Sequence, residues 1–148
     1  MLKTTFDPAI EVPFLKAIIY GAAGAGKTHL ASGFKGKILY LLTEPQGRST
    51  VANCAKMGNW NPENVIIEIY SWQDWLNFLH KVTDEDLQGF DLIVLDTIDH
   101  LDDYNCQSIA TSAKKEAIEQ ISDYGASRAA AISRLHQFVV SFIAVAPL

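Results

Sequence analysis

The eight residues from Gly21 to Thr28 constrain the fold more than any other part of this chain. They read Gly-Ala-Ala-Gly-Ala-Gly-Lys-Thr, which is the spacing of a phosphate-binding loop. The glycines allow the backbone to curl so that successive N–H groups point at one polyphosphate. Such a loop follows a strand and opens a helix. Apolar residues at 17–20 and the segment 29–32 predict that strand and that helix.

Individual positions in this loop predict contacts with a bound nucleotide and its metal. Lys27 is expected to reach the β and γ phosphates, and the Thr28 hydroxyl is expected to ligate Mg²⁺. The N-terminus of the following helix adds partial positive charge at the same place. The predicted nucleotide-binding residues are Gly21, Ala22, Ala23, Gly24, Ala25, Gly26, Lys27, Thr28 and His29.

Composition places the chain among globular proteins and narrows its partners. A length of 148 residues predicts one domain, spanning 1–148 with a core at about 16–146. The net charge of −5 argues against holding nucleic acid by bulk electrostatics. Cys54 and Cys106 form no CxxC pair, which favours free thiols in a reducing compartment. The N-terminus lacks an apolar signal core, and no apolar run is long enough to span a bilayer, so we expect a cytoplasmic protein.

Strand patterns alternate with helical patterns along the rest of the chain. Strands are predicted at 37–42, 65–70, 90–96 and 143–146, and helices at 50–57, 71–82, after Asp96 with a break near 122–123, and at 125–142. Ser71 and Asp74 form a capping box for the second of these helices, whose aromatic face is expected to pack in the core. This alternation predicts an α/β fold, a three-layer α/β/α sandwich around a mostly parallel sheet.

Asp96 ends an apolar strand, Leu92 to Leu95, and resembles the second motif of nucleotide sites. In that motif the carboxylate holds Mg²⁺ through water, so Asp96 joins Thr28 as a predicted metal-binding residue. Taken alone, an aspartate in this position also fits a simple cap at the end of a buried strand. Its place downstream of a phosphate-binding loop favours the metal role.

Glu44 is the candidate for the group that activates water. Ring ATPases and helicases usually carry a glutamate directly after the metal-binding aspartate, but this chain has Thr97 there. Glu44 follows the second strand and is expected beside the loop, where a carboxylate could orient water opposite the γ phosphate. The alternative is an exposed loop glutamate before Pro45. Glu44 and Lys27 are therefore the predicted catalytic residues.

Several phosphate-loop classes are disfavoured by what the sequence lacks. It has no Asn-Lys-x-Asp motif for reading guanine and no Leu-Ser-Gly-Gly signature of transporter ATPases. A small-molecule kinase would need an arginine-rich lid, and the chain has only Arg48, Arg128 and Arg134. We therefore rank kinase activity below ATP hydrolysis and below ATP-dependent switching.

The combined motifs resemble phage-type AAA-domain nucleotide-binding proteins, which are P-loop NTPases with a RecA-like core. Some members of that group assist single-strand annealing and recombination. The resemblance implies ATP and Mg²⁺ as cofactors, a water-activating role for Glu44, and a location in the bacterial host's cytoplasm. It also implies later sheet strands and a polar sensor residue beyond the fifth strand, so the chain is either shortened or a fragment. The segments that carry the resemblance are 18–28, 40–44, 92–97 and 123–125.

The resemblance also implies partners. Residues 104–122 occupy the place of a DNA-contacting loop and include Lys114 and Lys115, although a lysine pair on a helix also fits a solvated surface. Arg128 or Arg134 could act in trans within a homo-oligomer. The first functional hypothesis is a Mg²⁺-dependent ATPase of phage DNA recombination or replication. The alternative is an ATP-switched module that binds or anneals single-stranded DNA with little hydrolysis.

Overall fold

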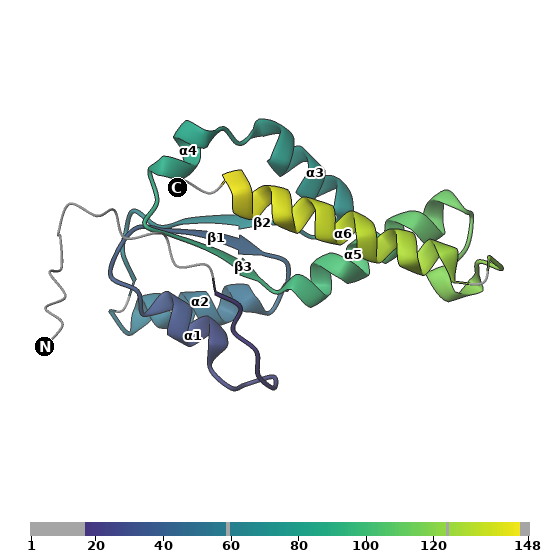
Figure 1. The fold of residues 1–148 in the computed structure, drawn as a ribbon. Helices are drawn as coiled ribbons and strands as arrows, with labels where there is room; N and C mark the ends of the chain where they lie inside the picture. Colours follow the sequence, from purple (N-terminus) through teal and green to yellow (C-terminus); the bar gives the residue numbers. More distant parts are fainter. Residues whose placement is uncertain (1–16, 59, 124, 146–148) are drawn as a thin grey trace, which may run out of the picture.

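The computed structural model describes residues 17–58, 60–123 and 125–145, which form a parallel sheet with helices on both faces (Figure 1). The strands are β1 (Ile38–Leu42), β2 (Val65–Glu68) and β3 (Leu92–Asp96). The helices are α1 (Lys27–Ser32), α2 (Gly47–Lys56), α3 (Trp72–Lys81), α4 (Asp84–Gln88), α5 (Ile98–Ser112), the 3₁₀ helix η1 (Ile118–Gln120) and α6 (Ala126–Val145).

The sheet has the strand order β2-β1-β3, and both pairings are parallel. All five residues of β1 are buried, as expected for a central strand covered on both faces. Its side chains alternate between two clusters. Ile38, Tyr40 and Leu42 pack with Val51 of α2, whereas Leu39 and Leu41 pack with residues of α3 and α5. The predicted α/β class and parallel sheet are confirmed, and the RecA-like type stays a prediction.

The strand predicted at 17–20 is wrong. Residues Ala17 to Tyr20 have no regular secondary structure, and the side chains of Ile18 and Tyr20 are 90% and 99% exposed. A strand needs a neighbour for its backbone hydrogen bonds. Within the part of the chain that the structure describes, no strand pairs with this segment. A short apolar run indicates that burying its side chains would be favourable. It does not indicate whether another strand is available to pair with its backbone.

The strand predicted at 143–146 is also wrong over the residues that can be compared. Helix α6 continues through Val145, and Ala146 lies outside the described residues. Extending an existing helix adds one backbone bond for each residue without a new nucleus, so a β-branched residue such as Val145 is tolerated. No breaker occurs before Pro147. The predicted helix at 125–142 is thus confirmed and is longer than expected.

Helix α3 begins where the sequence predicts. The Ser71 hydroxyl accepts a hydrogen bond from the Asp74 N–H at 3.1 Å, and the Asp74 carboxylate accepts from the Tyr70 N–H at 3.2 Å. Trp72 and Trp75 are 4% and 0% exposed, so the aromatic face packs in the core as predicted. Helix α4 was not predicted, although Thr83 and Asp86 form a complete capping box that signals its start.

Replacing Ser71 with alanine is expected to lower the free energy of unfolding by about 1 kcal/mol, because the Asp74 N–H loses its acceptor. Urea denaturation followed by circular dichroism would measure the change. The matched control is Gln73→Ala on the same helix, since the exposed Gln73 contacts only Asn77 across one turn and should change stability by much less. Equal losses in the two variants would contradict a capping role for Ser71.

Helices α5 and α6 form a hairpin that extends past the carboxyl end of the sheet (Figure 1). Cys106 of α5, Ile118 of η1 and Ala131 of α6 are buried together in a small cluster of their own. The Asp123 carboxylate accepts a hydrogen bond from the Ser127 N–H at 2.8 Å and thereby caps the start of α6. Since α5 starts two residues after Asp96, this hairpin is joined directly to the strand that carries the candidate metal ligand.

Candidate functional site

The predicted phosphate-binding loop leads directly into α1. Gly24 and Gly26 have φ angles of 78° and 86°, in the left-handed region that favours glycine. The Ala25 N–H donates to the Ala22 carbonyl oxygen at 3.1 Å and closes a tight turn between them. Gly26 is the residue before α1, and its carbonyl oxygen accepts from the Leu30 N–H at 2.8 Å. The glycines at these positions therefore meet a conformational requirement, as the motif predicts.

The Lys27 ammonium folds back over the loop. Its Nζ donates to the carbonyl oxygens of Gly21 at 2.6 Å and Ala22 at 3.1 Å. These two bonds hold the positive charge above the loop, on the side that the loop residues enclose. Carbonyl oxygens are neutral acceptors, and a charged phosphate oxygen forms a stronger bond with an ammonium group. The Lys27 side chain is therefore placed where it could exchange these partners for phosphate.

Thr28 and Asp96 meet although they are 68 positions apart in the sequence. The Thr28 hydroxyl donates to Asp96 Oδ2 at 2.6 Å, a short bond to a charged acceptor. Asp96 is only 8% exposed and is the last residue of β3. A hydroxyl and a carboxylate side by side are hard oxygen donors of the kind that Mg²⁺ prefers. The structure thus brings together the two residues predicted to bind the metal.

Tyr40 and Ser32 fix α1 against the sheet. The Ser32 hydroxyl donates to the Thr28 carbonyl oxygen at 2.8 Å, and the Tyr40 hydroxyl donates to the same oxygen at 3.1 Å. Burial is the main cause that raises the pKa of Tyr40 to about 12, so its hydroxyl stays protonated as a donor at neutral pH. This contact sets the height of Thr28 relative to β1.

Glu44 and the phosphate-binding loop line the same cavity of about 260 Å³. Glu44 is half-buried, and its carbonyl oxygen accepts from the Gly47 N–H at 3.0 Å at the start of α2. Glu44 is thus a loop residue that is less exposed than the alternative assumed, and its role in activating water stays a prediction. The cavity is lined by Ala23, Gly24, Gly26, Lys27, Thr28, His29, Glu44, Gln46, Gly47, Thr50, Asp96 and Thr97.

The lining contains both predicted and unexpected residues. Gln46, Gly47 and Thr50 come from the start of α2, and the sequence analysis did not single them out. Their place in the sequence could have indicated them, because they follow Glu44 within a few residues at the start of the next helix. Of the predicted loop residues, Gly21, Ala22 and Ala25 do not line the cavity. The first two contribute the carbonyl oxygens that hold Lys27.

His29 lines the cavity from the third position of α1 and also contacts the helix beside it. Its Nδ1 lies 3.3 Å from the Sγ of the buried Cys54 on α2. Cys54 and Cys106 are both free thiols, as predicted from their spacing. The contact between His29 and Cys54 joins α1 to α2 beneath the cavity.

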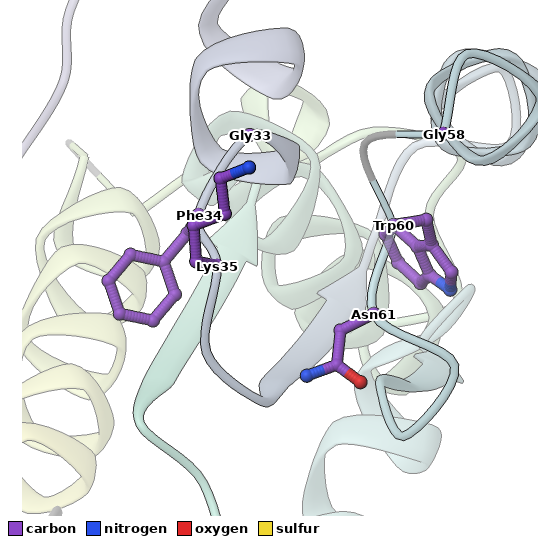
Figure 2. Close-up of a pocket in the computed structure, with 6 residues that line it drawn as sticks. All are labelled: Gly33, Phe34, Lys35, Gly58, Trp60 and Asn61. Atoms are coloured by element: carbon purple, nitrogen blue, oxygen red, sulfur yellow. The ribbon is translucent and has the colours of Figure 1, made fainter.

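A second hollow of about 180 Å³ lies at the opposite end of α1, between the segments that follow α1 and α2 (Figure 2). Gly33, Phe34, Lys35, Gly58, Trp60 and Asn61 line it. Phe34 and Trp60 stand on opposite sides and do not face each other (Figure 2). The described residues that line it include no carboxylate and no part of the phosphate-binding loop. The cavity beside Lys27 is therefore the candidate site.

The two arginines considered as trans groups both make contacts within the chain. Arg128 Nη2 pairs with the Asp102 carboxylate at 3.1 Å, and the Arg134 guanidinium lies 4.5 Å from the centre of the Trp72 ring. Lys114 and Lys115 are exposed in the turn after α5, where Glu116 is also exposed. This mixture of charges gives the end of the hairpin no strongly basic face.

The parallel sheet, the glycine turns before α1 and the contact of Thr28 with Asp96 define the class of a nucleotide-binding domain with a phosphate-binding loop. A family model described as an AAA domain matches residues 14–145, which is most of the chain. The chain belongs to this AAA-domain family of P-loop NTPases, and membership indicates nucleotide binding and ATPase activity.

Comparisons with curated proteins and with solved structures find no match to this chain. The helices in the described part of the chain are all too short or too polar to cross a membrane. The family match therefore carries the assignment, together with the geometry of the cavity.

Proposed function

We propose that this protein is a Mg²⁺-dependent ATPase that acts in phage DNA recombination or replication. The observation that carries the enzymatic part is the 2.6 Å bond between the Thr28 hydroxyl and the Asp96 carboxylate, which line the same cavity as Lys27 and Glu44. Membership of the AAA-domain family supports ATP as the bound nucleotide. The resemblance of the sequence motifs to phage-type proteins supports a role in DNA recombination or replication.

The charges that line the cavity favour a metal as part of the substrate complex. One lysine and two carboxylates leave a formal charge of −1 with His29 neutral, and a polyphosphate would be repelled by that balance. Thr28 and Asp96 would hold Mg²⁺, which neutralises phosphate charge when bound. Lys27 would move from the carbonyl oxygens of the loop to the β and γ phosphates.

Glu44 would activate the water molecule that attacks the γ phosphate. A carboxylate that lines the same cavity as the loop can accept a proton from water and direct its oxygen at the γ phosphorus. The water oxygen forms a bond to phosphorus while the bond to the bridging oxygen of ADP breaks. Thr97 cannot take this role, because a hydroxyl group is too weak a base to accept the proton. The Thr97 hydroxyl instead lies 3.1 Å from Nδ1 of His100 at the start of α5.

Single-stranded DNA would bind at the α5–α6 hairpin, which starts next to the site and carries Lys114 and Lys115.

The measurement that tests the proposed function is phosphate release from ATP and Mg²⁺, with and without single-stranded DNA at fixed salt, with Lys27→Ala as the blank. We expect release that needs Mg²⁺ and rises several-fold with DNA. ATP binding without release would favour the ATP-switched DNA-binding module. Release that DNA leaves unchanged would remove DNA from the proposal.

A further inference from the structure

Thr43 links the two segments of backbone that carry the carboxylates of the cavity, Glu44 and Asp96. It follows β1, precedes Glu44 in the chain, and is 0% exposed. Its backbone N–H donates to the Asp96 carbonyl oxygen at 2.9 Å. Thr43 is therefore bonded to the residue predicted to bind the metal and covalently joined to the residue predicted to activate water.

The Thr43 hydroxyl makes two hydrogen bonds to one residue. It donates to the Thr97 carbonyl oxygen at 2.6 Å and accepts from the Thr97 N–H at 2.7 Å. Both bonds cross 54 positions of sequence and hold the residue directly after Asp96. The hydroxyl thus uses both its donor and its acceptor capacity on the turn that leaves β3.

The Thr43 carbonyl oxygen is held from a third direction. The Tyr104 hydroxyl of α5 donates to it at 2.8 Å. This carbonyl belongs to the peptide group that joins Thr43 to Glu44, so the bond fixes the orientation of that peptide. The N–H, the carbonyl oxygen and the hydroxyl of Thr43 all have partners, and those partners come from the end of β3, the Thr97 turn and α5.

These hydroxyl bonds are not needed to set the register of the sheet. β1 and β3 are already aligned by five residue pairs, which run from Ile38 with Leu92 to Leu42 with Asp96. The bonds from the Thr43 hydroxyl begin after the last of these pairs, where the two chains leave the sheet and enter the site. They act on the two turns that place Glu44 and Asp96.

We propose that Thr43 is a positioning residue for ATP hydrolysis, which fixes the backbone of Glu44 relative to that of Asp96. The inference rests on the proposed function, since it assigns Thr43 a role in that reaction. Valine has nearly the same shape as threonine but would leave the Thr97 N–H and carbonyl oxygen without these partners. A displacement of about 1 Å at a reacting group can cost about 100-fold in rate.

The test compares Thr43→Val, Thr43→Ser and the control Asn77→Val, which replaces an exposed polar side chain of α3 with valine. Each variant is assayed for kcat, for the Kd of a fluorescent ATP analogue without metal, and for the Mg²⁺ concentration that gives half-maximal analogue binding. For Thr43→Val we expect kcat to fall about 10- to 100-fold and the Mg²⁺ requirement to rise several-fold, with the metal-free Kd within about threefold. Thr43→Ser should recover most of both losses, and Asn77→Val should match the wild type.

Two results would overturn the inference. One is an unchanged kcat and Mg²⁺ requirement in Thr43→Val. The other is an equal loss in the valine and serine variants that follows a lower Tm, which would indicate a structural role only. A wild-type protein that binds no nucleotide would instead count against the proposed function. If the wild type binds ATP without hydrolysing it, the Mg²⁺ requirement is the deciding measurement. An unchanged Mg²⁺ requirement in Thr43→Val would then overturn the inference.

Discussion

Replacing Lys27 with alanine is expected to weaken ATP binding by at least about 100-fold and to abolish measurable phosphate release. Lys27 is the sole lysine or arginine among the described residues that line the cavity, which also include the carboxylates of Glu44 and Asp96. Its removal leaves the polyphosphate with repulsion from Glu44 and Asp96 and without its strongest donor. A 100-fold loss corresponds to about 2.7 kcal/mol, which is the usual size of a charge-assisted contact with phosphate.

Isothermal titration with ATP and Mg²⁺ would measure the loss, and the control is Lys56→Ala. Lys56 is exposed at the end of α2, whereas the start of that helix lines the cavity. The two substitutions remove the same charge from the whole protein, so a difference between them reports the local contact. Retained affinity in Lys27→Ala would show that the polyphosphate binds elsewhere.

The phosphate-binding loop could be predicted because its requirements are local. The positive φ angles of Gly24 and Gly26, the turn closed by Ala22 and Ala25, and the start of α1 at Lys27 lie within a few residues. The same holds for the cap at Ser71, where donor and acceptor are three residues apart. Local conformational demands select residue types directly, and such selection is visible in a single sequence.

The contacts of Thr43 could not be predicted, because they depend on how distant segments align. Its hydroxyl meets Thr97 only after β1 and β3 pair in the observed register. A threonine at the end of a strand is common, and nothing in its neighbours signals a partner 54 positions away. The position of Gln46 and Thr50 on the cavity wall depends in the same way on the direction that α2 takes after Glu44.

The two strands that were predicted wrongly show where a local sequence pattern is not sufficient. Both 17–20 and 143–146 are short apolar runs, and such runs do not distinguish a strand from another apolar segment. At 143–145 the helix already begun at Ala126 continues, and at 17–20 no strand within the described residues pairs with the segment. The predictions for β1 and β3 succeeded because each run could pair with the other.

Replacing Glu44 with glutamine is expected to separate binding from turnover. Glutamine keeps the size and hydrogen-bonding capacity of the side chain but cannot accept a proton from water, so phosphate release should fall about 100- to 1000-fold. ATP affinity should stay within about threefold, since Lys27, Thr28 and Asp96 make the proposed contacts with phosphate and metal. Single-turnover phosphate release, together with titration of ATP, would measure the two effects independently.

The matched control is Glu63→Gln, because Glu63 is exposed and lies just before β2, whereas Glu44 follows the end of β1 in this parallel sheet. Unchanged release in Glu44→Gln would remove Glu44 from the mechanism and leave Asp96 as the one carboxylate among the described lining residues that could activate water. Loss of ATP affinity together with release would indicate that Glu44 acts in the ground state. Only the loss of release at nearly constant affinity agrees with a carboxylate that acts on water, since that contact strengthens as the proton leaves.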